Sequence, residues 1–417
     1  MHSNDTDKKD NTLTIRMVCL VLFLLFCLGW LYFFQADMLS VAQHWLSGGK
    51  THYDRNVGTL IITTVLVVVQ LLVYVITRLS RRSHALTYLP SFLLLAFVSS
   101  VSFPFRWGHW LWAGPLVLVL WVGVVIVARK VPTFAAEQKG AQGLLSRCMW
   151  INVLQMAAMM LMVASVGNTQ AVAHYKARAE VALMQGDADE ALRVGHRSLE
   201  SDASLTMLRA FALAQKGQLG ERLFEYPISG TGADLLPLRG SNSHLLVMPD
   251  TLLWQLFGIG PDSIAIRNDS ALRVALMADT TRRVYLDVNP YAKRLSTSQY
   301  IDTLEHLACV ANDSAVTHAY RDYRLMASLI NRQLDAFTRQ LPRYYTVNDS
   351  LPRHYREALV LYRHLNADTL LYNYSDSMMM HRFEQFHQMD SVYPRKSERR
   401  LRTEDDFHDT YWYYYYN

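Results

Sequence analysis

The chain has 417 residues, of which 51% are hydrophobic and 18% are charged, and its formal net charge is +5. Residues 1–167 hold 13 basic and six acidic residues, whereas the remainder holds 28 basic and 30 acidic residues. The positive surplus therefore belongs to a strongly apolar N-terminal part, and the nearly neutral remainder has no field for a polyanion, which argues against nucleic acid as a partner.

Five apolar runs predict a transmembrane bundle of five helices over residues 1–167. The hydrocarbon core of a bilayer is about 30 Å thick and needs roughly 20 apolar residues in a helix. The runs are Met17–Phe34, Val57–Thr77, Leu86–Phe105, Leu111–Ala128 and Cys148–Val166. None of them contains Lys, Arg, Asp or Glu. Since transporters usually carry ionisable groups within their spans, this composition disfavours ion-coupled transport.

Basic residues between the runs predict an orientation. Ten of them lie in the N-terminal tail and in the second and fourth connections, against three in the first and third connections. The positive-inside rule then places the N-terminus in the cytoplasm and everything after Gly167 on the opposite face, which is the periplasm in a bacterium. We expect the first run to be retained rather than cleaved as a signal peptide, because no small-residue cleavage site follows it.

Residues 168–226 predict tetratricopeptide-like helical hairpins. The phrase Ala182–Gly186 returns thirty residues later as Ala212–Gly217, each time after a run of small and apolar residues at helical spacing. The pattern resembles a tetratricopeptide unit, in which small residues let paired helices approach closely around a turn that contains Gly. The spacing is nearer 30 than the 34 residues of that family.

Residues 227–270 predict an irregular insert, because Gly, Pro, Ser and Asp dominate them. The insert is either a lid or an ordered part of the repeat array. Helical periodicity resumes at Ala271, so residues 271–417 predict further helical hairpins, with Pro342 and Pro352 at helix ends. The expected fold class is all-α: a five-span transmembrane bundle followed by a tetratricopeptide-like α-solenoid.

Two aromatic clusters are candidate contact surfaces. At the periplasmic interface, Trp107 and Trp110 accompany Arg106 and His109. A cation beside an imidazole could act on a lipid-linked phosphate or sugar, although a simple interfacial anchor is the favoured interpretation. This pair is the alternative catalytic site.

The second cluster is the run of six aromatic residues from Tyr411 to Tyr416. It is either a strap over the last helices or a plug into a partner, in which case Tyr411, Trp412 and Tyr413 are the candidate contact residues.

The remaining residues give no signature of catalysis. No P-loop, Rossmann glycine run, G-x-S-x-G or H-E-x-x-H motif occurs, so no cofactor and no metal is expected. Cys309 is the single cysteine after residue 167, which excludes a disulfide bond within the soluble part.

The segments LPRHYREALVLY at 351–362 and DDFHDTYWYYYYN at 405–417 resemble those of an uncharacterised family of bacterial envelope proteins. Members of that family join N-terminal membrane spans to a tetratricopeptide-like C-terminal region, and the resemblance implies an architecture and a location but no activity.

The sequence therefore favours a periplasmic helical-repeat scaffold, anchored in the bacterial inner membrane, that binds an envelope protein or peptide and contacts membrane lipids. The alternative is an enzyme or accessory factor that acts on lipid-linked glycan at the membrane interface. Whether the chain is an enzyme is uncertain, but binding is favoured.

Overall fold

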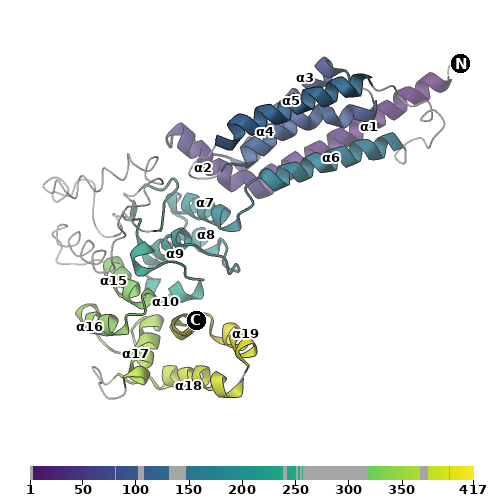
Figure 1. Cartoon of the computed structure of the whole chain (residues 1–417). Coiled ribbons are helices and arrows are strands. Elements are labelled where there is room, and N and C mark those ends of the chain that lie inside the picture. The colour runs from purple at the N-terminus through teal and green to yellow at the C-terminus, as the bar shows by residue number, and fades with distance from the viewer. Residues whose placement is uncertain are drawn as a thin grey trace. The chain divides into compact units, whose positions relative to one another are not determined.

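The structure is a computed structural model that describes residues 3–79, 81–101, 108–130, 147–237, 242–249, 252, 253, 256, 318–366, 374–393 and 395–417. It divides into two compact units, Met1–Gln170 and Ala171–Asn417, which we call unit 1 and unit 2. All regular secondary structure in the described ranges is helical, as the sequence predicts (Figure 1).

Unit 1 is a bundle of apolar helices. Its elements are α1 (Ser3–Gly29), the π-helix η1 (Trp30–Gln35), α2 (Ala36–Ser47), α3 (Arg55–Thr77), the 3-10 helix η2 (Arg81–Tyr88), α4 (Leu89–Ser99), α5 (Gly108–Lys130) and α6 (Arg147–Val166).

Four of the helices are long and apolar enough to cross a membrane, which indicates a multi-pass membrane protein. They cover Leu13–Ser47, Arg55–Thr77, Trp110–Arg129 and Arg147–Val166. A shorter apolar helix covers Ser83–Ser99 and overlaps the third predicted run, which begins at Leu86. The first helix extends well beyond the predicted Phe34, because η1 and α2 continue α1 without a break.

The outer surface of unit 1 is apolar, unlike that of a water-soluble bundle. Large apolar side chains point outward along whole helix faces, as Leu13, Met17, Val21 and Leu25 do on α1. The interior holds apolar side chains such as Phe23 and Phe92 together with polar ones that are less than a tenth exposed: Thr59, Thr63, Gln70, Ser91, Ser99 and Asn152. This arrangement is stable only where hydrocarbon surrounds the bundle, because exposed apolar area then costs nothing and polar groups need internal partners.

Hydrogen bonds between segments of unit 1 involve four of these interior groups, those of Gln70, Ser91, Ser99 and Asn152. The indole N–H of Trp30 donates to Ser99 Oγ over 2.8 Å. Asn152 Oδ1 accepts the backbone N–H of Ala85 over 2.8 Å. Such hydrogen bonds hold the helices together in lipid, where no hydrophobic effect drives apolar helices to associate.

Contacts at the two ends of unit 1 fix the direction of each segment. At one end, the Arg16 guanidinium lies 4.8 Å from the ring centroid of Tyr74, and Arg129 Nε donates to the Thr77 carbonyl over 2.9 Å. His84 packs edge-on against the same Tyr74 ring. This end therefore gathers the beginnings of α1 and η2 and the ends of α3 and α5.

At the other end, Trp30 and Ser99 meet, and the Asn168 N–H donates to the Ser99 carbonyl over 2.8 Å. Arg55 forms a 3.0 Å ion pair with Asp37. Consecutive segments of unit 1 therefore alternate in direction.

Unit 2 is built of short helices. They are α7 (Ala171–Met184), α8 (Ala188–Arg193), α9 (Ala203–Gln215), α10 (Leu219–Arg222), η5 (Leu223–Glu225), η6 (Gly232–Leu235), α15 (His318–Ile330), α16 (Leu334–Tyr344), α17 (Arg353–Leu365), α18 (Ser377–Val392), α19 (Lys396–Phe407) and α20 (Tyr411–Tyr416).

Three helical hairpins in unit 2 have the same type of turn between their two helices. After α7, the Asp187 N–H donates to the Ala182 carbonyl, and after α9, the Gln218 N–H donates to the Leu213 carbonyl. The residues before these donors, Gly186 and Gly217, have φ of 80° and 65°. Such left-handed residues end helices and are usually glycine.

The third hairpin joins α15 to α16, where the Gln333 N–H donates to the Ser328 carbonyl and Arg332 has φ of 57°. An arginine thus occupies the position of the turn glycine, so this repeat has no glycine signal in the sequence.

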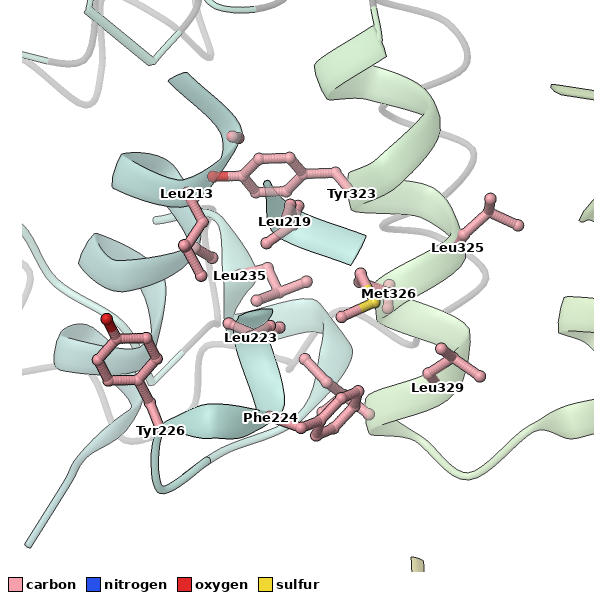
Figure 2. Close-up of a cluster of buried hydrophobic side chains, with 14 of the residues drawn as sticks. Leu213, Leu219, Leu223, Phe224, Tyr226, Leu235, Tyr323, Leu325, Met326 and Leu329 are labelled. Carbon is pink, nitrogen blue, oxygen red and sulfur yellow. The ribbon is translucent and has the colours of Figure 1, made fainter. Parts of the chain in front are cut away.

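The insert contributes to the core of unit 2. Figure 2 shows Leu235 between side chains of α9, α10 and α15, among them Leu213, Leu219 and Met326. Leu236, Leu245 and Met248 are also buried in this core. The described part of residues 227–270 is therefore an ordered part of the array.

We expect Asn152→Leu to destabilise unit 1, because the substitution leaves the buried Ala85 N–H without its side-chain acceptor. Loss of such a bond within a membrane bundle costs about 1–2 kcal/mol. Unfolding of the full chain in mild detergent measures this loss. Leu154→Val on the same helix is the control, since Leu154 is exposed to lipid and its shortening should change stability little. Equal stability of the two variants would contradict the assignment.

Candidate functional site

An open cleft lies between α18 and α19 in unit 2. Its volume is about 480 Å³. It is lined by Arg382, Gln385, Gln388, Met389, Val392, Tyr393, Asp406 and Phe407. The first five share one face of α18, because residues three, four and seven apart are neighbours on a helix.

The lining combines polar side chains with apolar surface, and Gln385 Nε2 lies 3.2 Å from Nε2 of His381. Gln385 and Gln388 are exposed, and the side chain of Gln388 makes no hydrogen bond within the described residues. Val392 is 61% exposed, whereas Phe407 is buried beneath the cleft. Each amide side chain offers both a donor and an acceptor, which matches the N–H and C=O groups of an extended peptide.

Charged groups connect this cleft to the interior of unit 2. Arg382 approaches Asp409 to 3.5 Å, and Asp409 pairs with Arg353 over 2.8 Å. Arg353 in turn pairs with the buried Glu357 over 2.9 Å. Although burial alone raises the pKa of the Asp409 carboxyl, the hydrogen bond and charge of Arg353 hold it below its ordinary value.

Glu357 attaches the terminal aromatic helix to α17. Its Oε2 accepts the Tyr411 N–H over 2.8 Å, and its backbone carbonyl accepts the Trp412 indole N–H over 2.8 Å. The Oε2 atom also lies 3.0 Å from Nδ1 of His354, whose Nε2 accepts the Phe224 N–H. The ring proton of His354 is therefore on Nδ1 and points at the carboxylate.

The structure places the aromatic contact candidates as follows. Tyr411 and Trp412 are fully buried against the core of unit 2 itself, and Tyr413 is half-buried. The segment thus packs as a strap over α17, and Tyr413 is the one of these three with surface left for a partner.

The predicted cluster at the membrane interface lies mostly outside the described residues. Arg106 and Trp107 are not described, and neither is the side chain of His109. Trp110, in the first turn of α5, is half-buried and meets the Phe97 ring edge-on at 5.5 Å between centroids. The pairing of Arg106 with His109 stays a prediction.

Metal and thiol chemistry have little basis in the described part of the chain. No group of three or more His, Cys, Asp or Glu side chains there could hold a metal ion. Cys19 and Cys27 are buried in unit 1, Cys148 is half-buried, and Cys309 lies outside the described residues.

The sequence analysis did not identify Asp322, a buried carboxylate in α15. Asp322 Oδ1 accepts the hydroxyl groups of Tyr345 and Tyr355 over 2.6 Å and 2.8 Å. Burial raises the pKa of Asp322, and the two hydroxyl bonds oppose that rise. Its position on the apolar face of an amphipathic helix was the only available signal.

Comparison with known protein families gives a match to one part of the chain. The model of a family of unknown function, DUF6057, matches residues 280–417. No curated protein and no solved structure matches the chain significantly. The matched segment contains the α18–α19 cleft, Glu357 and the aromatic helix, and it is similar to a family without an assigned activity.

We expect Asp322→Asn to change the pH dependence of stability. The pKa of Asp322 in the folded state lies above its ordinary value of 3.8. The folded state therefore binds the proton of this carboxyl more tightly than the unfolded state does. The contribution of Asp322 to stability therefore falls as pH rises above about 4. The asparagine variant keeps the acceptor oxygen and should lack this fall, as measured by chemical unfolding of the full chain across pH.

Asp409→Asn is the matched control, because the pKa of Asp409 is lowered and its contribution is lost as pH falls. Identical pH profiles for wild type and Asp322→Asn would show that the burial of Asp322 does not perturb its titration.

Proposed function

We propose that unit 1 crosses the bacterial inner membrane five times, with the N-terminus in the cytoplasm and unit 2 in the periplasm. The alternation of the segments supports this number, because η2 and α4 together run between the same two ends as the longer helices. A 3-10 helix rises about 2.0 Å per residue and an α-helix about 1.5 Å, so Ser83–Ser99 covers roughly 27 Å. That length nearly matches the hydrocarbon core.

The distribution of charge supports the orientation. Arg16, Arg78, Arg129 and Arg147 belong to the end where α1 and α6 begin, and Asp37 and Asp54 belong to the other end. The positive-inside rule assigns the arginine-rich end to the cytoplasm.

We further propose that unit 2 is a scaffold that binds a segment of an envelope protein or peptide. The α18–α19 cleft carries this proposal, because it combines exposed amides with apolar surface and the side chain of Gln388 makes no hydrogen bond within the described residues. An extended peptide would pair its backbone with Gln385 and Gln388 and place an apolar side chain over Phe407. Arg382 and Asp406 at the rim would favour partners with complementary charges.

Site-specific photocrosslinking in native membranes tests the proposal. A photoreactive residue at Gln388 or Val392 should give a discrete protein or peptide adduct. The same residue at Met378, which is 81% exposed at the start of α18, is the control and should not. The double variant Gln385→Ala and Gln388→Ala should reduce the adduct about tenfold, because two buried amide pairs would be lost.

Equal labelling at Met378 would contradict a specific cleft. Adducts with lipid or glycan alone would instead favour the enzyme hypothesis, which requires Arg106 and His109.

A further inference from the structure

A three-residue pattern recurs after residue 167: Asp, then Ser or Thr, then Ala, Val, Ile, Leu or Met. Of the 20 aspartates in this part of the chain, 11 directly precede Ser or Thr, although only 31 of its 250 residues are Ser or Thr. Nine of the 11 pairs complete the pattern, which we call the triad. The triads begin at Asp250, Asp262, Asp269, Asp302, Asp313, Asp349, Asp368, Asp376 and Asp390, and residues 1–167 contain none.

The hydroxyl residues of three triads lie in the described part of unit 2, and they share exposure but not secondary structure. Ser350 lies in the turn between α16 and α17, Ser377 is the first residue of α18, and Ser391 lies in the last turn of α18. All three serines are exposed to solvent. Because their structural contexts differ, no common role in the fold accounts for the triad.

Helix capping explains the aspartate of one triad but not the residue that follows it. Asp376 caps α18, since its Oδ1 accepts the Met379 N–H over 3.0 Å. The caps of α8 and α9, Asp187 and Asp202, are instead followed by alanine. A capping aspartate therefore does not require a hydroxyl group at the next position.

The hydroxyl groups that serve the fold lie outside the triads. Among the described residues of unit 2, the buried Ser and Thr residues are Ser204, Thr206, Ser243, Ser328, Thr338, Thr403 and Thr410, and none of them belongs to a triad. Thr410 follows Asp409 but precedes Tyr411, so it breaks the pattern, and its Oγ1 accepts the Tyr413 N–H. The triad therefore distinguishes exposed hydroxyl groups from buried ones.

We propose that the triad is an acceptor sequence for glycosylation, in which a transferring enzyme attaches a sugar to the Ser or Thr oxygen. The triad suits recognition by a second molecule, because it is accessible and the fold does not require it. The hydroxyl oxygen forms a bond with the anomeric carbon of a phosphate-activated sugar, and the bond between that carbon and the phosphate oxygen breaks. The phosphate leaves with the electron pair, and the hydroxyl proton passes to a base of the transferring enzyme.

The surroundings of these hydroxyl groups favour a neutral sugar over a phosphate. A phosphate would lie beside the aspartate of the triad, and at Ser391 it would also lie near the negative C-terminal end of α18. A neutral sugar meets no such repulsion. It would also cover the apolar third residue, which is exposed in two of the described triads, since Met378 is 81% exposed and Val392 is 61% exposed.

The proposal does not depend on peptide binding in the α18–α19 cleft, because Ser350, Ser377 and Ser391 are not among the residues that line it.

Mass spectrometry of peptides from the full chain, purified from its native membranes, tests the proposal. The peptides that contain Ser350 and Ser377 should each carry a saccharide. Ser350→Ala should abolish the saccharide on the first peptide, and Asp349→Asn should do the same although it keeps the hydroxyl group. Ser397 is exposed but follows Lys396 rather than an aspartate, so it is the internal control and should stay unmodified.

Absence of the saccharide from either peptide of the wild type would overturn the proposal, and so would a phosphate in its place. Equal modification of Ser397, or undiminished modification of Asp349→Asn, would show that the triad is not the acceptor sequence. Both substituted residues are exposed, so the variants should unfold at the same denaturant concentration as the wild type in mild detergent. That measurement separates loss of the acceptor from loss of the fold.

Discussion

A surround of hydrocarbon is the constraint on which the rest of this structure depends. The helices of unit 1 expose Leu, Val, Ile and Trp along most of their outer faces, and α5 has only Val125 below a tenth exposed among its described residues. In water this surface would drive collapse or aggregation, whereas in lipid it is neutral. The interior pairs between Trp30 and Ser99 and between Asn152 and Ala85 then supply the specificity that apolar contacts in lipid cannot.

Unit 2 is held together differently. A small number of buried carboxylates accept hydrogen bonds from distant parts of the chain. Glu180 holds residues 246–248, Asp322 holds two tyrosine hydroxyls, and Glu357 holds the start of the aromatic helix. Each is destabilising if its donors leave, because an unpaired charge in a low dielectric is costly. These contacts fix one arrangement of short helices that have little stability individually.

The distinction between used and unused polar groups underlies the functional proposals. Glu180, Asp322 and Glu357 have their donors within the chain, so they serve the fold. The side chain of Gln388 in the α18–α19 cleft makes no hydrogen bond within the described residues.

The sequence predicted those features that depend on local pattern. The apolar runs indicated membrane helices, and Gly186 and Gly217 marked the first two hairpin turns. The turn of the third hairpin could not be recognised in the sequence, because Arg332 rather than glycine adopts the left-handed conformation there. The guanidinium of Arg332 donates to the Tyr414 carbonyl. The cleft could not be predicted, since it arises from the packing of α18 against α19. The third run was predicted at Leu86–Phe105, whereas the apolar helix covers Ser83–Ser99, because its first part is a 3-10 helix that gives no distinct apolar period.

The parity of the membrane crossings is the most direct test of the account, because an odd number separates the N-terminus from unit 2. Paired reporters, one active only in the periplasm and one only in the cytoplasm, can be fused after Asn417 in a bacterial host. The account predicts activity of the periplasmic reporter and silence of the cytoplasmic one. The reverse result would mean that the Ser83–Ser99 segment does not cross, and that unit 2 lies on the cytoplasmic side.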